Sequence, residues 1–123
     1  LRCASCRRAF VTRSLIMHAK IIAACEAFSV GDSTAALDFI ADGIEWHIVG
    51  DRTIDGNAAV KEMCEDAASQ GKANFQNGRV IKGKNHIVVE GADLDTDMHY
   101  CDIYTIEQEQ IMEITSYCLA GIE

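Results

Sequence analysis

The sequence contains no proline and no long apolar run. Proline lacks a backbone N–H group and interrupts strands, so its absence is compatible with long, uninterrupted strands. A membrane-spanning helix needs about 18 consecutive apolar residues. No stretch approaches that length, so we expect no membrane partner. With 123 residues, 49% of them hydrophobic and 24% charged, the chain has the length and composition of one globular domain.

Motifs for common cofactors and nucleophiles are also absent. There is no glycine-rich phosphate loop and no serine in a nucleophile elbow. The four histidines are scattered, without the H-x-H or H-E-x-x-H spacing that would indicate a metal site. His18, His86 and His99 fit structural or exposed positions better than functional ones. These patterns give no reason to expect a metal or any other cofactor.

Positive charge is scarce outside the N-terminus. The formal net charge is −8, yet residues 1–25 carry five arginines and lysines and no acidic residue. The rest of the chain is therefore strongly acidic. Nucleic-acid recognition depends on a basic surface that faces the phosphates, so this acidic body argues against nucleic acid as a partner.

Six cysteines occur without a recognisable secretion signal, because His18 and Lys20 interrupt the apolar run 15–27. This combination favours a cytoplasmic protein with reduced, buried thiols. Cys3 and Cys6 form a lone C-x-x-C pair. A zinc site would need a second pair or histidines at ligand spacing, and a redox motif would need a preceding strand and a helix. An inert tail is therefore favoured.

Residues 1–12 are interpreted as an N-terminal extension and residues 13–123 as the domain. The extension is rich in arginine and free of acid, which superficially resembles an organelle transit peptide. Its composition does not distinguish a transit peptide from a plain extension, or from residues upstream of an internal start at Met17.

The first half of the domain has helical periodicity interrupted by one strand. Apolar residues at three- and four-residue steps predict a helix over 13–30 that is apolar nearly all round. Gly31 can end this helix, and a second helix is expected over 33–42. Alternation over 44–49 predicts a strand. A third helix is expected over 57–70, with a buried apolar stripe.

The second half changes to a period of two. Strands are predicted over 74–82, 86–90, 98–107 and 111–119, with a polar loop over 91–97. Helices grouped early and hairpin-linked strands late indicate an α+β fold. We expect a curved antiparallel sheet wrapped over the N-terminal helices, which leaves an interior pocket between sheet and helices.

Taken in order, the elements over residues 14–120 resemble the NTF2-like superfamily, in its SnoaL-like and ketosteroid-isomerase-like branch. The motifs that carry the resemblance are Val30-Gly31-Asp32, Ala41-Asp42, Trp46 in its strand, the Gly50 turn, Ile54-Asp55-Gly56, Tyr100-Cys101-Asp102-Ile103-Tyr104 and Glu113-Ile114-Thr115-Ser116-Tyr117. The resemblance implies a cystatin-like α+β cone with an interior pocket, usually assembled into homodimers through the sheet. Members include isomerases, cyclases, epoxide hydrolases, dehydratases and binding or scaffold proteins, so the fold alone does not assign an activity.

His47 is the first candidate catalytic residue. The resemblance implies that it occupies the position, counted back from Gly50, where ketosteroid isomerases place the carboxylate that moves protons. An imidazole titrates near neutrality and suits a general base. The alternative is a structural histidine bonded to a backbone carbonyl, or one exposed on the other face of the sheet.

Asp102 is the second candidate. It lies in a predicted strand between Tyr100 and Tyr104, which share its face. Desolvation in such a row raises the pKa of a carboxyl. The resemblance implies the position where a protonated aspartate donates to an oxyanion. The alternative is a solvated aspartate on the open face of the sheet.

If Asp102 points inward, mostly apolar side chains share its face and form a binding pocket. The expected binding residues are Trp46, Met98, Tyr100, Tyr104, Ile114, Ser116 and Cys118. The alternative is a plain core row, and Trp46 in particular fits a packing role. Two family features are missing. Ala23-Ala24-Cys25 replaces the first-helix tyrosine of the isomerases, and Tyr100 stands where the epoxide hydrolases have arginine.

Two functional hypotheses follow. In the first, the chain is a cofactor-independent, isomerase- or cyclase-like enzyme that acts on a small, largely apolar carbonyl compound. His47 moves a proton, and Asp102, with help from the tyrosines, stabilises the enolate oxygen. In the second, the same cavity belongs to a non-catalytic module that binds hydrophobic ligands or serves as a dimeric scaffold. The expected partners are a small apolar molecule and a second copy of the chain.

Overall fold

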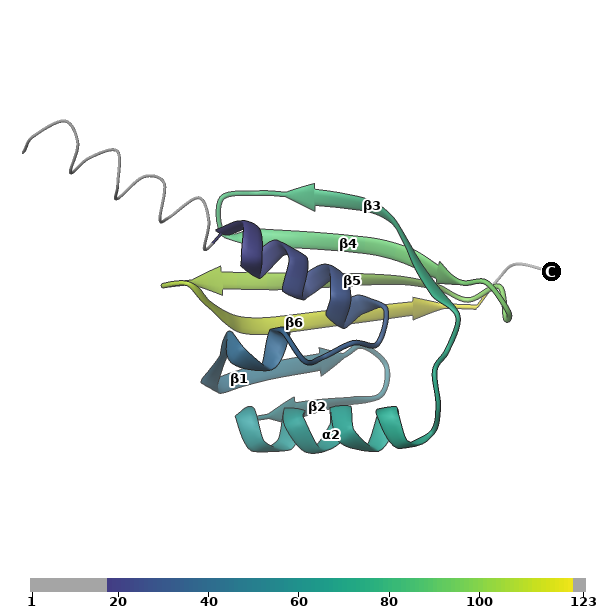
Figure 1. The fold of residues 1–123 in the computed structure, drawn as a ribbon, viewed down its shortest axis with the longest axis horizontal. Helices are drawn as coiled ribbons and strands as arrows, with labels where there is room; N and C mark the ends of the chain where they lie inside the picture. Colours follow the sequence, from purple (N-terminus) through teal and green to yellow (C-terminus); the bar gives the residue numbers. More distant parts are fainter. Residues whose placement is uncertain (1–17, 121–123) are drawn as a thin grey trace, which may run out of the picture.

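The computed structural model describes residues 18–120 (Figure 1). In chain order the elements are a helical segment over 18–29, the short 3-10 helix η1 (Ala36–Asp38), β1 (Ile40–Ile48), β2 (Arg52–Asp55), α2 (Asn57–Ser69), β3 (Phe75–Lys82), β4 (His86–Asp93), β5 (His99–Glu107) and β6 (Gln110–Leu119). The strands form one sheet in the order β2-β1-β6-β5-β4-β3. β1 and β6 are parallel, and the other neighbouring pairs are antiparallel. No helix among the described residues is long and apolar enough to cross a membrane.

The helices pack against one face of this curved sheet. The helical segment 18–29 lies over the central strands, and α2 lies beside β2 and contacts β1 and β2 (Figure 1). The buried side chains of the 18–29 segment recur at three- and four-residue steps: Ile21, Ala24, Cys25 and Phe28. They join inward residues of the sheet, such as Tyr104 and Ile114, in one apolar core. The predicted α+β class is confirmed.

The four-strand meander of the second half also matches the prediction, with one difference in length. β4 continues through Asp93, so the first part of the predicted loop 91–97 is strand. It does so because Gly91 and Ala92 still pair with β5. The predicted extension 1–12, the domain start at residue 13 and the Cys3–Cys6 pair lie outside the described residues.

The predicted helix over 33–42 is wrong. Only the short η1 is helical there, and β1 already begins at Ile40. The buried residues Ala36, Ile40 and Ile44 have the four-residue spacing of a helix. However, Ile40 pairs with Ile111 of β6, and an irregularity in register follows between Ile40 and Glu45. This bulge breaks the strand alternation that would have revealed the longer strand.

β2 is absent from the predicted elements. It pairs antiparallel with β1 through a tight turn in which Gly50 has a φ of 86°. Of its four residues only Ile54 is buried, so the strand is too short to show alternation. The strand matters for the outer face of the sheet, because its register places Thr53 beside His47.

Strand register decides which side chains face the helices. β6 lies between β1 and β5. Trp46 pairs with Ile114 across the parallel strands, and Asp102 pairs with Ser116 across the antiparallel ones. Side chains alternate along a strand, so Trp46, Ser116 and Asp102 point to the helix-covered face and His47 points to the opposite one.

Candidate functional site

A cavity of about 240 Å³ lies between the helix-covered face of the sheet and the two helices. Its lining residues are Phe28, Ser29, Gly31, Ser33, Trp46, Ile48, Met63, Cys64, Ala67, Phe75, Met98, Tyr100, Asp102, Ser116 and Cys118. Most of these side chains are apolar. Among the described residues that line the cavity, Asp102 has the only carboxyl group. Such a cavity, apolar with a few convergent polar groups, is typical of a small-molecule site.

Asp102 is the polar centre of this cavity. It lies mid-strand in β5 and is only 8% exposed. Burial raises the pKa of its carboxyl, because the charged form loses solvation, while hydrogen bonds from the Ser116 and Ser29 hydroxyls act in the opposite direction. Burial thus favours the protonated carboxyl, while the two serine hydroxyls can donate hydrogen bonds to the charged form.

Each of these two serine hydroxyls also forms a hydrogen bond with an aromatic side chain. The Trp46 Nε1–H donates to the Ser116 hydroxyl at 2.9 Å. Because an indole N–H can only donate, the proton of Ser116 remains available for Asp102. The hydroxyls of Ser29 and Tyr104 lie 2.6 Å apart. When Asp102 is ionised and accepts from Ser29, Tyr104 is the donor of this pair.

A second hydrogen-bond network fixes one wall of the cavity. The Tyr100 hydroxyl donates to Asn77 Oδ1 at 2.7 Å, and Asn77 Nδ2 donates to the carbonyl of Glu26 at 2.8 Å. Burial, followed by the nearby Asp102 charge, raises the pKa of Tyr100 to about 12, so its hydroxyl stays protonated. The Tyr100 ring covers Gly91 on β4, where an added Cβ would overlap the Tyr100 hydroxyl group. A side chain at position 91 is therefore incompatible with this ring position.

The thiols near the cavity are held in their neutral form. Burial is the largest cause that raises the pKa of Cys64 and of Cys118, and both therefore stay as neutral thiols at neutral pH. Cys25, in the segment that replaces the isomerase tyrosine, is fully buried in the core, and its pKa is raised to about 12. None of these cysteines supplies a thiolate to the cavity.

The structure brings most of the predicted binding residues together. Those that line the cavity are Trp46, Met98, Tyr100, Ser116 and Cys118, with Asp102. Tyr104 and Ile114 lie behind them, fully buried in the core, and Tyr104 reaches the polar network through Ser29. The sequence did not reveal the residues contributed by the 18–29 segment and by β3, such as Ser29, Phe75 and Asn77. Those positions depend on tertiary packing and carry no local signal.

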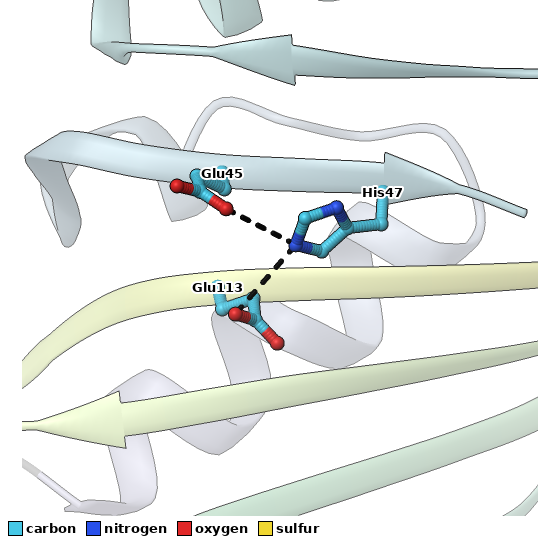
Figure 2. Close-up of side chains that lie close together, drawn as sticks. All are labelled: Glu45, His47 and Glu113. Atoms are coloured by element: carbon cyan, nitrogen blue, oxygen red, sulfur yellow. Dashed lines mark ion pairs between the residues drawn. The ribbon is translucent and has the colours of Figure 1, made fainter.

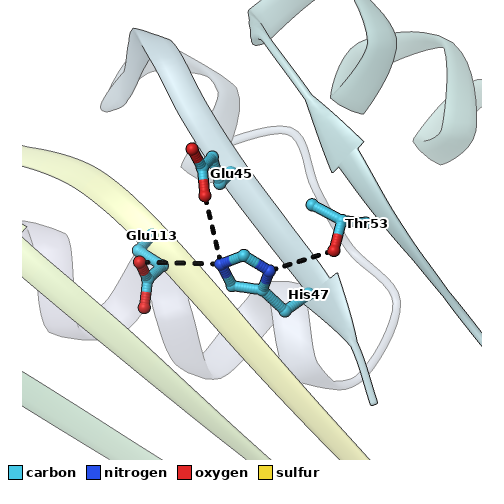
Figure 3. A network of polar contacts seen from close by, with 4 residues as sticks. All are labelled: Glu45, His47, Thr53 and Glu113. Carbon is cyan, nitrogen blue, oxygen red and sulfur yellow. Dashed lines mark hydrogen bonds and ion pairs between the residues drawn. The ribbon is translucent and has the colours of Figure 1, made fainter. Parts of the chain in front are cut away.

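His47 does not line this cavity. Its ring contacts Glu45, Thr53 and Glu113, which project from β1, β2 and β6 (Figures 2 and 3). The sheet therefore separates the two predicted catalytic residues, and the expected convergence of His47 and Asp102 on one pocket is absent. The physical reason is that side chains alternate along a strand: Trp46 points inward, so the adjacent His47 points outward.

The architecture is an α+β cone whose cavity opens between the sheet and the helices. Sequence comparison identifies the family. The family model described as a SnoaL-like domain matches residues 21–114. The chain belongs to the SnoaL-like branch of the NTF2-like superfamily. No curated protein matches the sequence.

Solved structures agree with this assignment. An NTF2-like protein of unknown function from Cytophaga hutchinsonii is 34% identical, with a TM-score of 0.74, over 84% of this chain and 99% of that one. A proposed ketosteroid isomerase from Kribbella flavida is 10% identical, with a TM-score of 0.61 and coverage of 88% and 78%. A proposed polyketide cyclase from Sinorhizobium meliloti is 14% identical, with a TM-score of 0.59 and coverage of 82% and 93%. The last two similarities show the fold alone.

Proposed function

We propose that the cavity binds a small, largely apolar carbonyl compound, with Asp102 hydrogen-bonded to the carbonyl oxygen. The observation that carries this proposal is the single carboxyl in a mostly apolar lining, hydrogen-bonded by two serine hydroxyls. A protonated carboxyl can donate to a carbonyl, and the raised pKa of Asp102 favours that form. An apolar cavity supplies affinity, while this one polar contact orients the ligand.

The size of the cavity sets how much of a ligand it can enclose. A cavity of about 150 Å³ holds benzene, so the 240 Å³ observed here suits about ten non-hydrogen atoms by the same ratio. One substituted ring or two fused rings have this size, and a four-ring steroid is too large to be enclosed. The absence of the isomerase tyrosine at Ala23-Ala24-Cys25 also argues against a steroid ligand.

The proposed probe is 2-indanone, a two-ring ketone of suitable size. Trp46 is the only tryptophan in the sequence and lines the cavity, so its fluorescence reports binding at this site. We expect saturable quenching in the native chain. Asp102→Leu, which removes the polar contact and keeps the branching of the side chain, should weaken binding about tenfold, the equivalent of one good hydrogen bond.

Glu107→Gln is the matched control, because Glu107 is an exposed acid at the end of the same strand. It should bind 2-indanone as the native chain does. Equal affinity in the native chain and Asp102→Leu would refute the role of the carboxyl, and absence of any saturable change would refute the ligand class.

Proton transfer is the second candidate function, and the raised pKa of Asp102 favours it. Because His47 is outside the cavity, one carboxyl would both remove and return the proton next to the carbonyl. Exchange of the α-protons of 2-indanone in D₂O, followed by NMR, tests this. Asp102→Asn should lower the protein-dependent rate by a factor of about 100 or more. Binding without exchange would support the non-catalytic binding module.

A further inference from the structure

Three potential ligands converge on the face of the sheet opposite the cavity: Glu45 and His47 of β1 and Glu113 of β6 (Figure 2). His47 Nε2 lies 3.3 Å from Glu45 Oε2 and 3.6 Å from Glu113 Oε2. One donor atom of each residue lies within 4.8 Å of the other two. This cluster shares no residue with the cavity lining.

The strand pairing explains why the three side chains meet. Glu45 and Glu113 are direct partners across the parallel strands, and His47 follows Glu45 by two residues on the same face. All three therefore project from hydrogen-bonded sheet, which positions ligands more accurately than a loop does.

A fourth residue orients the imidazole. Thr53, the partner of His47 on β2, has its hydroxyl 3.1 Å from His47 Nδ1 (Figure 3). This contact occupies Nδ1 and directs Nε2 between the two carboxylates. Metal-binding histidines are commonly held in this way, with one ring nitrogen bonded to a second group and the other facing the ion.

The separations between these ligand atoms suit a small divalent cation. Tetrahedral zinc with ligand distances of about 2.0–2.1 Å requires ligand atoms about 3.3 Å from one another. The two distances from His47 Nε2, at 3.3 and 3.6 Å, are already close to this value. The carboxylates need to approach each other, and both side chains are free to rotate because they are 53% and 46% exposed.

Charge also favours a cation. Across residues 18–120, no lysine or arginine lies within 4.0 Å of Glu45 or Glu113, and His47 is their one basic neighbour. Two carboxylates and a neutral imidazole together carry the charge that a divalent ion neutralises. We propose that Glu45, His47 and Glu113 bind a first-row divalent transition cation. This one-nitrogen, two-oxygen set is compatible with Mn²⁺ and Zn²⁺.

Mn²⁺ is the probe of choice for the test. It prefers oxygen ligands such as carboxylates over thiolates, which matters because the chain has six cysteines. Titration of the full chain with Mn²⁺, followed by paramagnetic broadening of amide NMR signals, should broaden the signals of residues 45–47, 53 and 113–115 first. The broadening should saturate with one equivalent.

Variants locate the ligands. His47→Ala and Glu113→Gln should each weaken Mn²⁺ binding by more than about tenfold, and Thr53→Val, which removes only the orienting hydroxyl, by about tenfold. Glu45→Gln serves as a further ligand variant if one of these fails to fold. His99→Ala and Glu107→Gln change exposed residues outside the cluster and should bind as the native chain does.

Two results would overturn the proposal. The first is broadening spread over the acidic surface without saturation. The second is saturable binding that His47→Ala and Glu113→Gln leave unchanged. In either case the cluster is a set of polar contacts between His47 and its two glutamates, without a cation. Neither result bears on the cavity, which lies on the other face of the sheet.

Discussion

Trp46 and Ser116 lie on neighbouring parallel strands, and the indole N–H donates to the serine hydroxyl at 2.9 Å. The bond leaves the serine proton directed to Asp102, so the parallel pairing of β1 with β6 connects the cavity wall to its carboxyl. The Trp46 ring also packs edge-on against Phe28 of the 18–29 segment, with ring centroids 5.2 Å apart. One residue thus links both layers of the fold to the site.

Ser116→Ala should raise the pKa of Asp102 further. The hydroxyl lowers this pKa by donating to the charged carboxyl, so its loss favours the protonated form. The Trp46 N–H also loses its acceptor, which should reduce the free energy of unfolding by about 1–3 kcal/mol. Carboxyl ¹³C NMR titration and urea unfolding measure the two effects. Ser69→Ala, an exposed serine on α2, is the control and should change neither.

Asp102 should make stability depend on pH with a defined sign. Its pKa is raised in the folded state, so the folded chain binds this proton more tightly than the unfolded chain, whose value is about 3.9. The contribution of Asp102 is therefore fully present below about pH 3.9 and is lost as pH rises through the folded pKa.

Urea unfolding of the native chain and Asp102→Asn across this range isolates the effect. The stability of the native chain relative to the variant should fall with rising pH, by at most about 1.4 kcal/mol per pH unit, and then become constant. A constant difference at all pH values, or one that grows with pH, would show that Asp102 does not have a raised pKa.

Gly91→Ala should destabilise the fold and disturb the cavity. The new methyl group would overlap the Tyr100 hydroxyl and the carbonyl oxygen of Gln76, and the backbone atom cannot move away easily. We expect a loss of about 1–3 kcal/mol in the free energy of unfolding and weaker binding of 2-indanone. Gly43→Ala is the matched control, since no atom lies within 4 Å of its added Cβ. Equal stability of the two variants would contradict the close approach of Tyr100.

A homodimer through the sheet, implied by the resemblance, remains a prediction. The outer side of β6 exposes Tyr117 (44%) and Leu119 (71%), which suits a second copy of the chain on this face. Sedimentation equilibrium should give twice the mass of the chain, and Tyr117→Asp should give monomers. The exposed Leu94, in the β4–β5 loop, provides the control Leu94→Asp, which should stay dimeric. A monomeric native chain would contradict the prediction.

The sequence predicts the parts of the fold that repeat a regular period. The meander and the helix that contains Ile21 and Phe28 were recognisable because each shows its period over at least two turns or four alternations. The start of β1 was hidden by a bulge, and β2 by its shortness. Both errors lie where tertiary pairing, and not local pattern, decides the structure.

The candidate site was predictable where strand alternation alone decides which way a side chain points. Tyr100 and Asp102 could be placed on one face by parity alone. Which face Trp46 and His47 occupy required the register with β6, and the parallel pairing that sets it joins segments about 70 residues apart. Ser29 and Asn77 entered the site through helix packing and a cross-strand contact, which no spacing in the sequence indicates.

We propose Asp102 as the polar recognition group of an apolar cavity. The most direct test is the dissociation constant of 2-indanone from Trp46 fluorescence, measured for the native chain and for Asp102→Leu. We expect saturable binding that the substitution weakens about tenfold. Equal dissociation constants for the two chains, or quenching that never saturates, would contradict it.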